Sequence, residues 1–180
     1  MCDLTPRTSP GVIAPVTIRH PDCRSSVAEN EAPHGRYRIE VARGNELSPA
    51  QLYALLRLRV DVFVVEQECA YPELDGADLL ATTEHVWAVA EPGVLGCLRV
   101  LGDTEPWRIG RVCTRPDARG RGIAASLLDQ ALRLLGHAET VLSAQTRAIG
   151  LYERFGFVAE GRPYDEDGIE HVTMRRRLER

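Results

Sequence analysis

The residues best suited to do chemistry in this sequence lie in "ARGRGIAASLL" (118–128), where two glycines and two arginines precede an apolar, helix-like run. The first four backbone N–H groups of a helix need partners, which Ser, Thr, Asp or Asn usually supply. Between Arg115 and Ile123 the one residue of these types is Asp117, which stands several positions too early to cap the helix. A bound anion would complete the cap, because glycines let it approach and arginines attract it. The stretch predicts a phosphate-binding loop, with a solvated loop capped by water as the alternative.

The same glycines also fit a dinucleotide fingerprint. Gly120, Gly122 and Ala125 match G-x-G-x-x-[GA], which in a Rossmann fold is followed by an acidic residue at the end of the next strand. Here the next strand, "ETVLSAQ" (139–145), ends with Gln145, and the strands before the loop resemble hairpins. A P-loop requires a lysine, and all 22 basic side chains are arginine. A dinucleotide-binding redox protein therefore stays an alternative that these features disfavour.

Length and composition indicate a single soluble domain preceded by an extension. A chain of 180 residues, 44% of them hydrophobic, is long enough to bury a sizeable core. Residues 1–36 carry five of the eleven prolines and no sustained hydrophobic period, so we expect a partly disordered N-terminal extension. Alternation in "YRIEVARG" (37–44) predicts the first strand of a domain that spans 37–180.

Charge and cysteine usage disfavour several classes of protein. A net charge of −4 offers no general attraction to nucleic acid or to an anionic membrane, and the basic "RRRLER" is expected to be a solvated end. The five cysteines are scattered without C-x-x-C spacing, which predicts a reduced, cytoplasmic protein. The sequence has no H-x-x-x-H pair or Cys/His cluster for a metal. The apolar "GVIAPVTI" (11–18) is short and contains a proline, which argues against a signal peptide or transmembrane helix.

The expected elements predict an α+β (mixed α/β) fold, because hairpin-like strands come first and strands alternating with helices follow. Ser48 as N-cap, Pro49 at the first position and Gln51 completing a capping box predict a helix in "LSPAQLYALLRLRVDVF" (47–63). Further strands are expected at 84–90, 94–102, 107–114, 139–145, 157–161 and 170–176, with a second helix that ends near Leu135 at Gly136 and a third that ends at Phe155.

Two motifs, in the right order, resemble those of the GCN5-related N-acetyltransferases (GNATs). Arg119, Gly122 and Ala124 fit the pyrophosphate motif R-x-x-G-x-[GA] of that superfamily. The segment "AIGLYERFGFVAEG" (148–161) is similar to the one in which a tyrosine precedes a Gly-Phe and a return strand. Two further stretches, 56–79 and 167–174, resemble the ElaA-like branch. The resemblance covers 37–177 and implies a central mixed, mostly antiparallel sheet of about six to seven strands flanked by helices.

The resemblance implies acetyl-CoA as cosubstrate. Its pyrophosphate would lie on the backbone amides of 119–124, and its pantetheine arm beside the strand 107–114, where two adjacent strands separate in this family. Amides freed there could stabilise the charge that forms when a neutral amine attacks the thioester directly in a ternary complex. The resemblance also implies that Gln145 contacts the cofactor, although an asparagine is more usual at that position of the family. The candidate cofactor-binding residues are Val112, Cys113, Thr114, Arg119, Gly120, Arg121, Gly122, Ile123, Ala124 and Gln145.

The resemblance also assigns a general acid. Tyr152 matches the tyrosine that protonates the departing CoA thiolate, and the alternative is a tyrosine that packs beside Ile149 and Phe155. A cysteine route through Cys113 is disfavoured, because nothing adjacent in the sequence supplies a base.

The general base is sought among the acidic residues after the first helix, which could attract a cationic amine or form a solvated loop. We choose Glu66 as the general base, and proton transfer through water is an equally acceptable alternative. His85 and His171 could also serve near neutral pH, although a lone strand histidine is more often structural. The acidic residues in question are Glu66, Glu68, Glu73, Asp75 and Asp78.

Together these features predict an acetyl-CoA-dependent N-acetyltransferase that acts on a primary amine of a small molecule or a peptide. No nucleic-acid or membrane partner is expected, and a homodimer is left open. The alternative is a non-catalytic acyl-CoA-binding or interaction module on the same fold.

Overall fold

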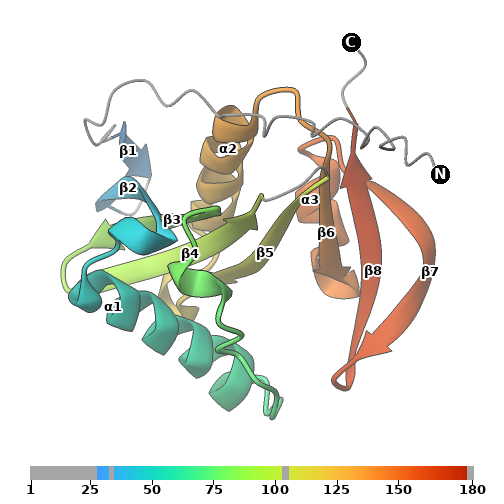
Figure 1. Ribbon diagram of the computed structural model, residues 1–180, viewed down its shortest axis with the longest axis horizontal. Coiled ribbons are helices and arrows are strands. Elements are labelled where there is room, and N and C mark those ends of the chain that lie inside the picture. The colour runs from blue at the N-terminus through green and yellow to red at the C-terminus, as the bar shows by residue number, and fades with distance from the viewer. Residues whose placement is uncertain (1–27, 33–34, 103–105, 178–180) are drawn as a thin grey trace, which may run out of the picture.

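The computed structural model describes residues 28–32, 35–102 and 106–177. Its strands are β1 (Ala28–Ala32), β2 (Gly35–Arg43), β3 (Thr83–Ala90), β4 (Gly93–Leu101), β5 (Trp107–Thr114), β6 (Thr140–Gln145), β7 (Val158–Glu166) and β8 (Ile169–Arg176). They form one eight-stranded sheet in the order β1-β2-β3-β4-β5-β6-β8-β7 (Figure 1). Neighbouring strands are antiparallel except for the pair β5 and β6. The predicted mixed, mostly antiparallel sheet is confirmed.

The sheet has one strand more than the sequence predicted. β1 lies in the segment that was expected to be an extension, and it pairs with β2 along its whole length. The described part of the sheet therefore begins at Ala28 and not at Tyr37. β1, with the sequence AENEA, shows no apolar alternation, and an edge strand needs none because backbone hydrogen bonds hold it. The remainder of the predicted extension, 1–27, lies outside the described residues.

The helices are α1 (Pro49–Arg59), α2 (Ile123–Leu135) and α3 (Ile149–Glu153). The capping box of α1 is confirmed: the Gln51 amide donates to Ser48 Oγ at 3.3 Å, and the Ser48 amide donates to Gln51 Oε1 at 2.9 Å. A π-helical segment, Val60–Glu66, continues α1. α2 stops at Gly136 as predicted, at a φ of 58° that favours glycine. No helix among the described residues is long and apolar enough to cross a membrane.

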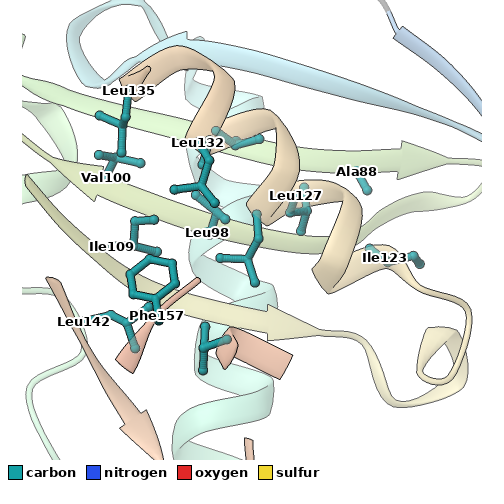
Figure 2. Close-up of a cluster of buried hydrophobic side chains, with 14 of the residues drawn as sticks. Ala88, Leu98, Val100, Ile109, Ile123, Leu127, Leu132, Leu135, Leu142 and Phe157 are labelled. Atoms are coloured by element: carbon teal, nitrogen blue, oxygen red, sulfur yellow. The ribbon is translucent and has the colours of Figure 1, made fainter. Parts of the chain in front are cut away.

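The helices cover both faces of the sheet. Along β3, Val86 and Ala88 belong to the core under α2 and α3, whereas Trp87 packs with α1 on the opposite face. Figure 2 shows Leu127 and Leu132 of α2 projecting onto the sheet. This double layer fixes the middle strands, β5 and β6, between which the candidate site lies.

Candidate active site

The parallel strands β5 and β6 begin as neighbours and then separate (Figure 1). Their registered pairs are Trp107 with Thr140 and Arg108 with Val141, although β5 continues to Thr114 and β6 to Gln145. Beyond these pairs, the edge of β5 that faces β6 has no ladder partner along these fully described strands. Backbone amides without partners are strong hydrogen-bond donors, so this gap can bind a polar, extended ligand.

A β-bulge bends β5 at the point of separation. Opposite β4, Cys113 pairs with Cys97 and Gly110 with Arg99, so the register shifts between these pairs. Arg111 lies in the shifted stretch and has a φ of 56°, which is uncommon for a residue other than glycine. Such a bulge increases the bend and twist of its strand, which accounts for the divergence of β5 from β6.

A cleft of about 910 Å³ occupies the gap and reaches side chains of both faces of the sheet. Most of the predicted cofactor-binding residues line it, and so does Tyr152. Of the predicted site residues, all of which are described, Arg121 and Glu66 do not line the cleft. Those that do are Val112, Cys113, Thr114, Arg119, Gly120, Gly122, Ile123, Ala124, Gln145 and Tyr152.

The N-terminus of α2 opens into this cleft without a side-chain cap, as the sequence predicted. Its N-cap is Gly122, and Asp117 instead accepts hydrogen bonds from Arg115 at 2.6 and 3.0 Å. Gly120 and Gly122 have φ values of 74° and 77°, and a Cβ added at either would meet no atom within 4 Å. The loop therefore combines unpaired amides, the positive end of a helix and open space, which fits a pyrophosphate.

The motif arginine is tied to the predicted base. Arg119 donates to both carboxylate oxygens of Glu66, at 2.7 and 2.6 Å, and its Nε donates to the Thr114 carbonyl at 3.2 Å. The hydrogen bond from Arg119 lowers the pKa of Glu66 below its usual value. A carboxylate that is held ionised outside the cleft is poorly suited to take a proton from an amine, so the geometry disfavours Glu66 as the base.

Tyr152 is packed in the core and also reaches the cleft. Its ring packs edge-on against Phe157, with centroids 6.2 Å apart, and its side chain also lines the cleft. Burial raises the pKa of the phenol to about 12. Tyr152 is therefore a protonated donor at neutral pH.

Gln145 links β6 to the segment after α1. Its Nε2 donates to Gln67 Oε1 at 3.1 Å, and its Oε1 accepts from Arg147 at 2.9 Å. Its predicted contact with the cofactor stays a prediction.

Cys113 packs against Cys97, with the two sulfur atoms 3.6 Å apart. The hydrogen bond between these thiols, together with burial, raises the pKa of Cys113 well above its usual value. Because the thiolate is the nucleophilic form, this environment disfavours an acyl-cysteine route.

The acidic segment after α1 is not the open acidic wall that the sequence suggested. Asp78 accepts from Arg59 at 2.5 Å and from Arg99 at 2.9 Å, and Glu73 also bonds to Arg59. Asp75 forms an ion pair with Arg99 at 2.5 Å. These groups neutralise one another and fix the loop. The signal that could have found the cluster is the presence of two arginines on the apolar faces of α1 and β4.

The β7–β8 hairpin forms the other wall, of which sequence reasoning had singled out His171 alone. Glu166, Asp167, Ile169 and His171 line the cleft opposite the loop after α1. Cys69 joins the two walls, because its thiol donates to the Asp167 carbonyl at 3.3 Å. Nothing local in the sequence marks this contact.

Separated parallel strands beside an uncapped helix, with a cleft that crosses the sheet, define the acyl-CoA-dependent acyltransferase class. Residues 59–178 match the family described as "Acetyltransferase (GNAT) domain". This chain belongs to that family. Binding of an acyl-CoA and transfer of its acyl group are accordingly the general activity of the fold.

Similar proteins place the chain near the ElaA-like branch. It is 46% identical to a UPF0039 protein of Mycobacterium tuberculosis over 136 residues, which cover 73% of this chain and 87% of that protein. It is 38% identical to Protein ElaA of Escherichia coli over 141 residues, which cover 74% and 92% of the two chains. The crystal structure of an acyl-CoA N-acyltransferase from Pseudomonas aeruginosa is 39% identical with a TM-score of 0.73, covering 78% of this chain and 99% of that one. The crystal structure of Escherichia coli ElaA has the same TM-score and coverage at 35% identity.

Proposed function

We propose that this protein transfers an acetyl group from acetyl-CoA to a primary amine of a small molecule or a peptide, by direct attack in a ternary complex. The observation that carries the proposal is the cleft between β5 and β6, which extends from the uncapped N-terminus of α2 to the β7–β8 hairpin. A cofactor can enter from one side and an amine from the other.

The chain offers partners to the pyrophosphate and to the pantetheine arm of the cofactor. The amides of residues 119–124 hold the pyrophosphate, where open space lies over Gly120 and Gly122. The free edge of β5, from Gly110 to Thr114, holds the pantetheine arm, and an amide of this edge stabilises negative charge on the thioester oxygen. Glu66 acts here as a partner that positions Arg119, and not as the base.

Tyr152 is the proposed general acid. Its phenol lies at the cleft and stays protonated, because burial raises its pKa to about 12. The same dry surroundings raise the basicity of a leaving thiolate, so a proton held by a weak acid still moves as charge develops on sulfur.

Structural relatives support transfer to nitrogen. The Pseudomonas aeruginosa protein, at 39% identity, is described as an acyl-CoA N-acyltransferase. BjaI, a CoA-dependent acyl-homoserine lactone synthase solved with SAM and isopentyl-CoA, shares the fold at 20% identity and a TM-score of 0.62.

A thermal-shift titration with acetyl-CoA, CoA, NAD and ATP, followed by a thiol-release assay with a panel of primary amines, tests the proposal. A ligand that binds the folded state raises its stability by mass action. We expect saturable shifts with acetyl-CoA and CoA, and CoA release that depends on the amine. Shifts without release for any amine would favour the non-catalytic module. A shift with NAD alone would point to the dinucleotide alternative.

A further inference from the structure

His171 of β8 lies where the β7–β8 wall of the cleft meets the gap between β5 and β6. It pairs in register with Gln145, the last residue of β6, and with Tyr164 of β7. Its side chain is 13% exposed and lines the cleft. An amine that approaches the gap from the acceptor side therefore passes this imidazole.

One hydrogen bond fixes which nitrogen of His171 is basic. Nδ1 lies 2.8 Å from the carbonyl oxygen of Ile169, and a carbonyl can only accept, so Nδ1 carries the hydrogen. Nε2 then holds the lone pair. Among the described residues nothing forms a hydrogen bond with Nε2, so the lone pair is available to a ligand.

The surroundings hold the ring in place. Tyr164 stacks on the imidazole with centroids 6.4 Å apart, and its hydroxyl lies 2.6 Å from Ser143 Oγ. Glu166 Oε2 is 3.9 Å from Nδ1. Of the titratable and charged groups nearby, Tyr164 stacks on the ring and Glu166 lies beside it. Asp167 of the hairpin turn, Cys69 after α1 and Arg147 after β6 line the same cleft.

Of the other candidate bases, Glu68 is exposed and does not line the cleft, and the rest are occupied. Glu66 is paired with Arg119, and Asp78 with two arginines. His85 is buried away from the cleft, where its Nε2 donates to the Asp78 carbonyl at 2.9 Å and burial lowers its pKa.

We propose that His171 Nε2 is the general base of the acyl transfer, an assignment that rests on the function proposed above. Nε2 takes one proton from the acceptor ammonium, and the freed lone pair attacks the thioester carbon. The C–S bond breaks and sulfur takes the proton of Tyr152. The second amine proton returns to Tyr152 through water in the cleft, and the imidazolium releases its proton to solvent. One ammonium and one thioester thus give one amide, one thiol and one proton.

A comparison of two small acceptors, ethylamine and hydroxylamine, isolates this step. Ethylamine is an ammonium at neutral pH and needs a base, whereas hydroxylamine is already neutral. Replacing His171→Gln should lower kcat/KM for ethylamine by about 10²–10⁴-fold, and should change the hydroxylamine rate by less than about threefold. With ethylamine, the difference in kcat/KM between the wild type and His171→Gln should narrow as the pH is raised toward about 10, because ethylamine begins to lose its own proton there.

The matched control is His137→Gln, an exposed histidine beyond α2 that does not line the cleft. An unchanged acetyl-CoA thermal shift in both variants shows that the cofactor site is intact. Three outcomes would overturn the base assignment. The first is an equal loss of kcat/KM with both acceptors in His171→Gln, and the second is no loss with ethylamine. The third is a wild-type enzyme that uses hydroxylamine but not ethylamine. An absence of turnover with either acceptor would contradict the proposed function instead.

Discussion

Glu66 and Arg119, 53 positions apart in the sequence, form a two-armed ion pair with N–O distances of 2.7 and 2.6 Å. Arg119 also donates to the Thr114 carbonyl, so it braces the end of β5 against the π-helical segment after α1. The arginine of the pyrophosphate motif is therefore largely neutralised. This leaves the backbone amides and the end of α2 as the main source of attraction for an anion.

The first prediction concerns Glu66→Gln. Since Glu66 only positions Arg119, we expect kcat/KM for the acceptor to fall by less than about fivefold, whereas removal of a general base costs about 10²–10⁴-fold. The pair is 45% and 37% exposed, so stability should change by about 0–1 kcal/mol. Steady-state kinetics provide the check, with Glu68→Gln as the control variant. A loss of a hundredfold or more in kcat/KM for Glu66→Gln would return the base role to Glu66.

The second prediction concerns the loop before α2. Gly122→Ala forces a side chain into a φ of 77°, which costs about 1–2 kcal/mol, and fills space meant for phosphate. We expect acetyl-CoA affinity to fall at least about tenfold, a change of about 1.4 kcal/mol. Gly136→Ala, at a φ of 58° and a ψ of −119° outside the cleft, is strained at least as much and serves as the control. Isothermal titration should show weakened binding in the first variant alone, and equal affinities would contradict the anion site.

The third prediction concerns Tyr152→Phe. Removing the hydroxyl should lower kcat by about 10²–10⁴-fold while acetyl-CoA still binds, because the ring continues to pack on Phe157. With a pKa of about 12, Tyr152 should cause no alkaline limb in the rate profile below about pH 10. Tyr53→Phe, on an exposed tyrosine of α1, is the control. A wild-type alkaline limb near neutral pH that disappears in Tyr152→Phe would speak against this assignment.

The fourth prediction concerns the buried ion cluster that Asp78, in the segment after α1, forms with Arg59 and Arg99. Burial would raise the pKa of Asp78, but Arg59 and then Arg99 outweigh it and hold the pKa below its usual value. A lowered folded-state pKa contributes stability that is present above the unfolded value and is lost as the pH falls. The free energy of unfolding should therefore decrease below about pH 4.

Asp78→Asn leaves two buried arginines with less compensation, so we expect a loss of about 3–5 kcal/mol at neutral pH and a flatter dependence on acid. Urea unfolding at neutral and acidic pH measures both effects. Asp129→Asn, which removes an exposed ion pair within α2, should cost less than about 0.5 kcal/mol. Equal losses in the two variants would mean that the buried cluster does not stabilise the loop.

Local features of the fold were predictable from the sequence. The capping box of Ser48 and Gln51, the stop of α2 at Gly136 and the uncapped start at Gly122 depend on residues within a few positions of one another. β1 escaped prediction because its pairing with β2 relies on backbone hydrogen bonds and leaves no apolar pattern.

The sequence by itself determined the glycine-rich loop, the order of the elements and the choice of Tyr152 as a site residue, because short-range spacing and family motifs carry that information. The tertiary structure decided which ionisable groups are free. Glu66 and Asp78 look alike in the sequence, yet arginines from distant elements neutralise both. His171, which the sequence offered only beside several other candidates, is favoured as the base because β8 places it beside the end of β6 and the Ile169 carbonyl fixes its tautomer. The proton affinity of a side chain depends on partners that only folding brings within a few ångströms.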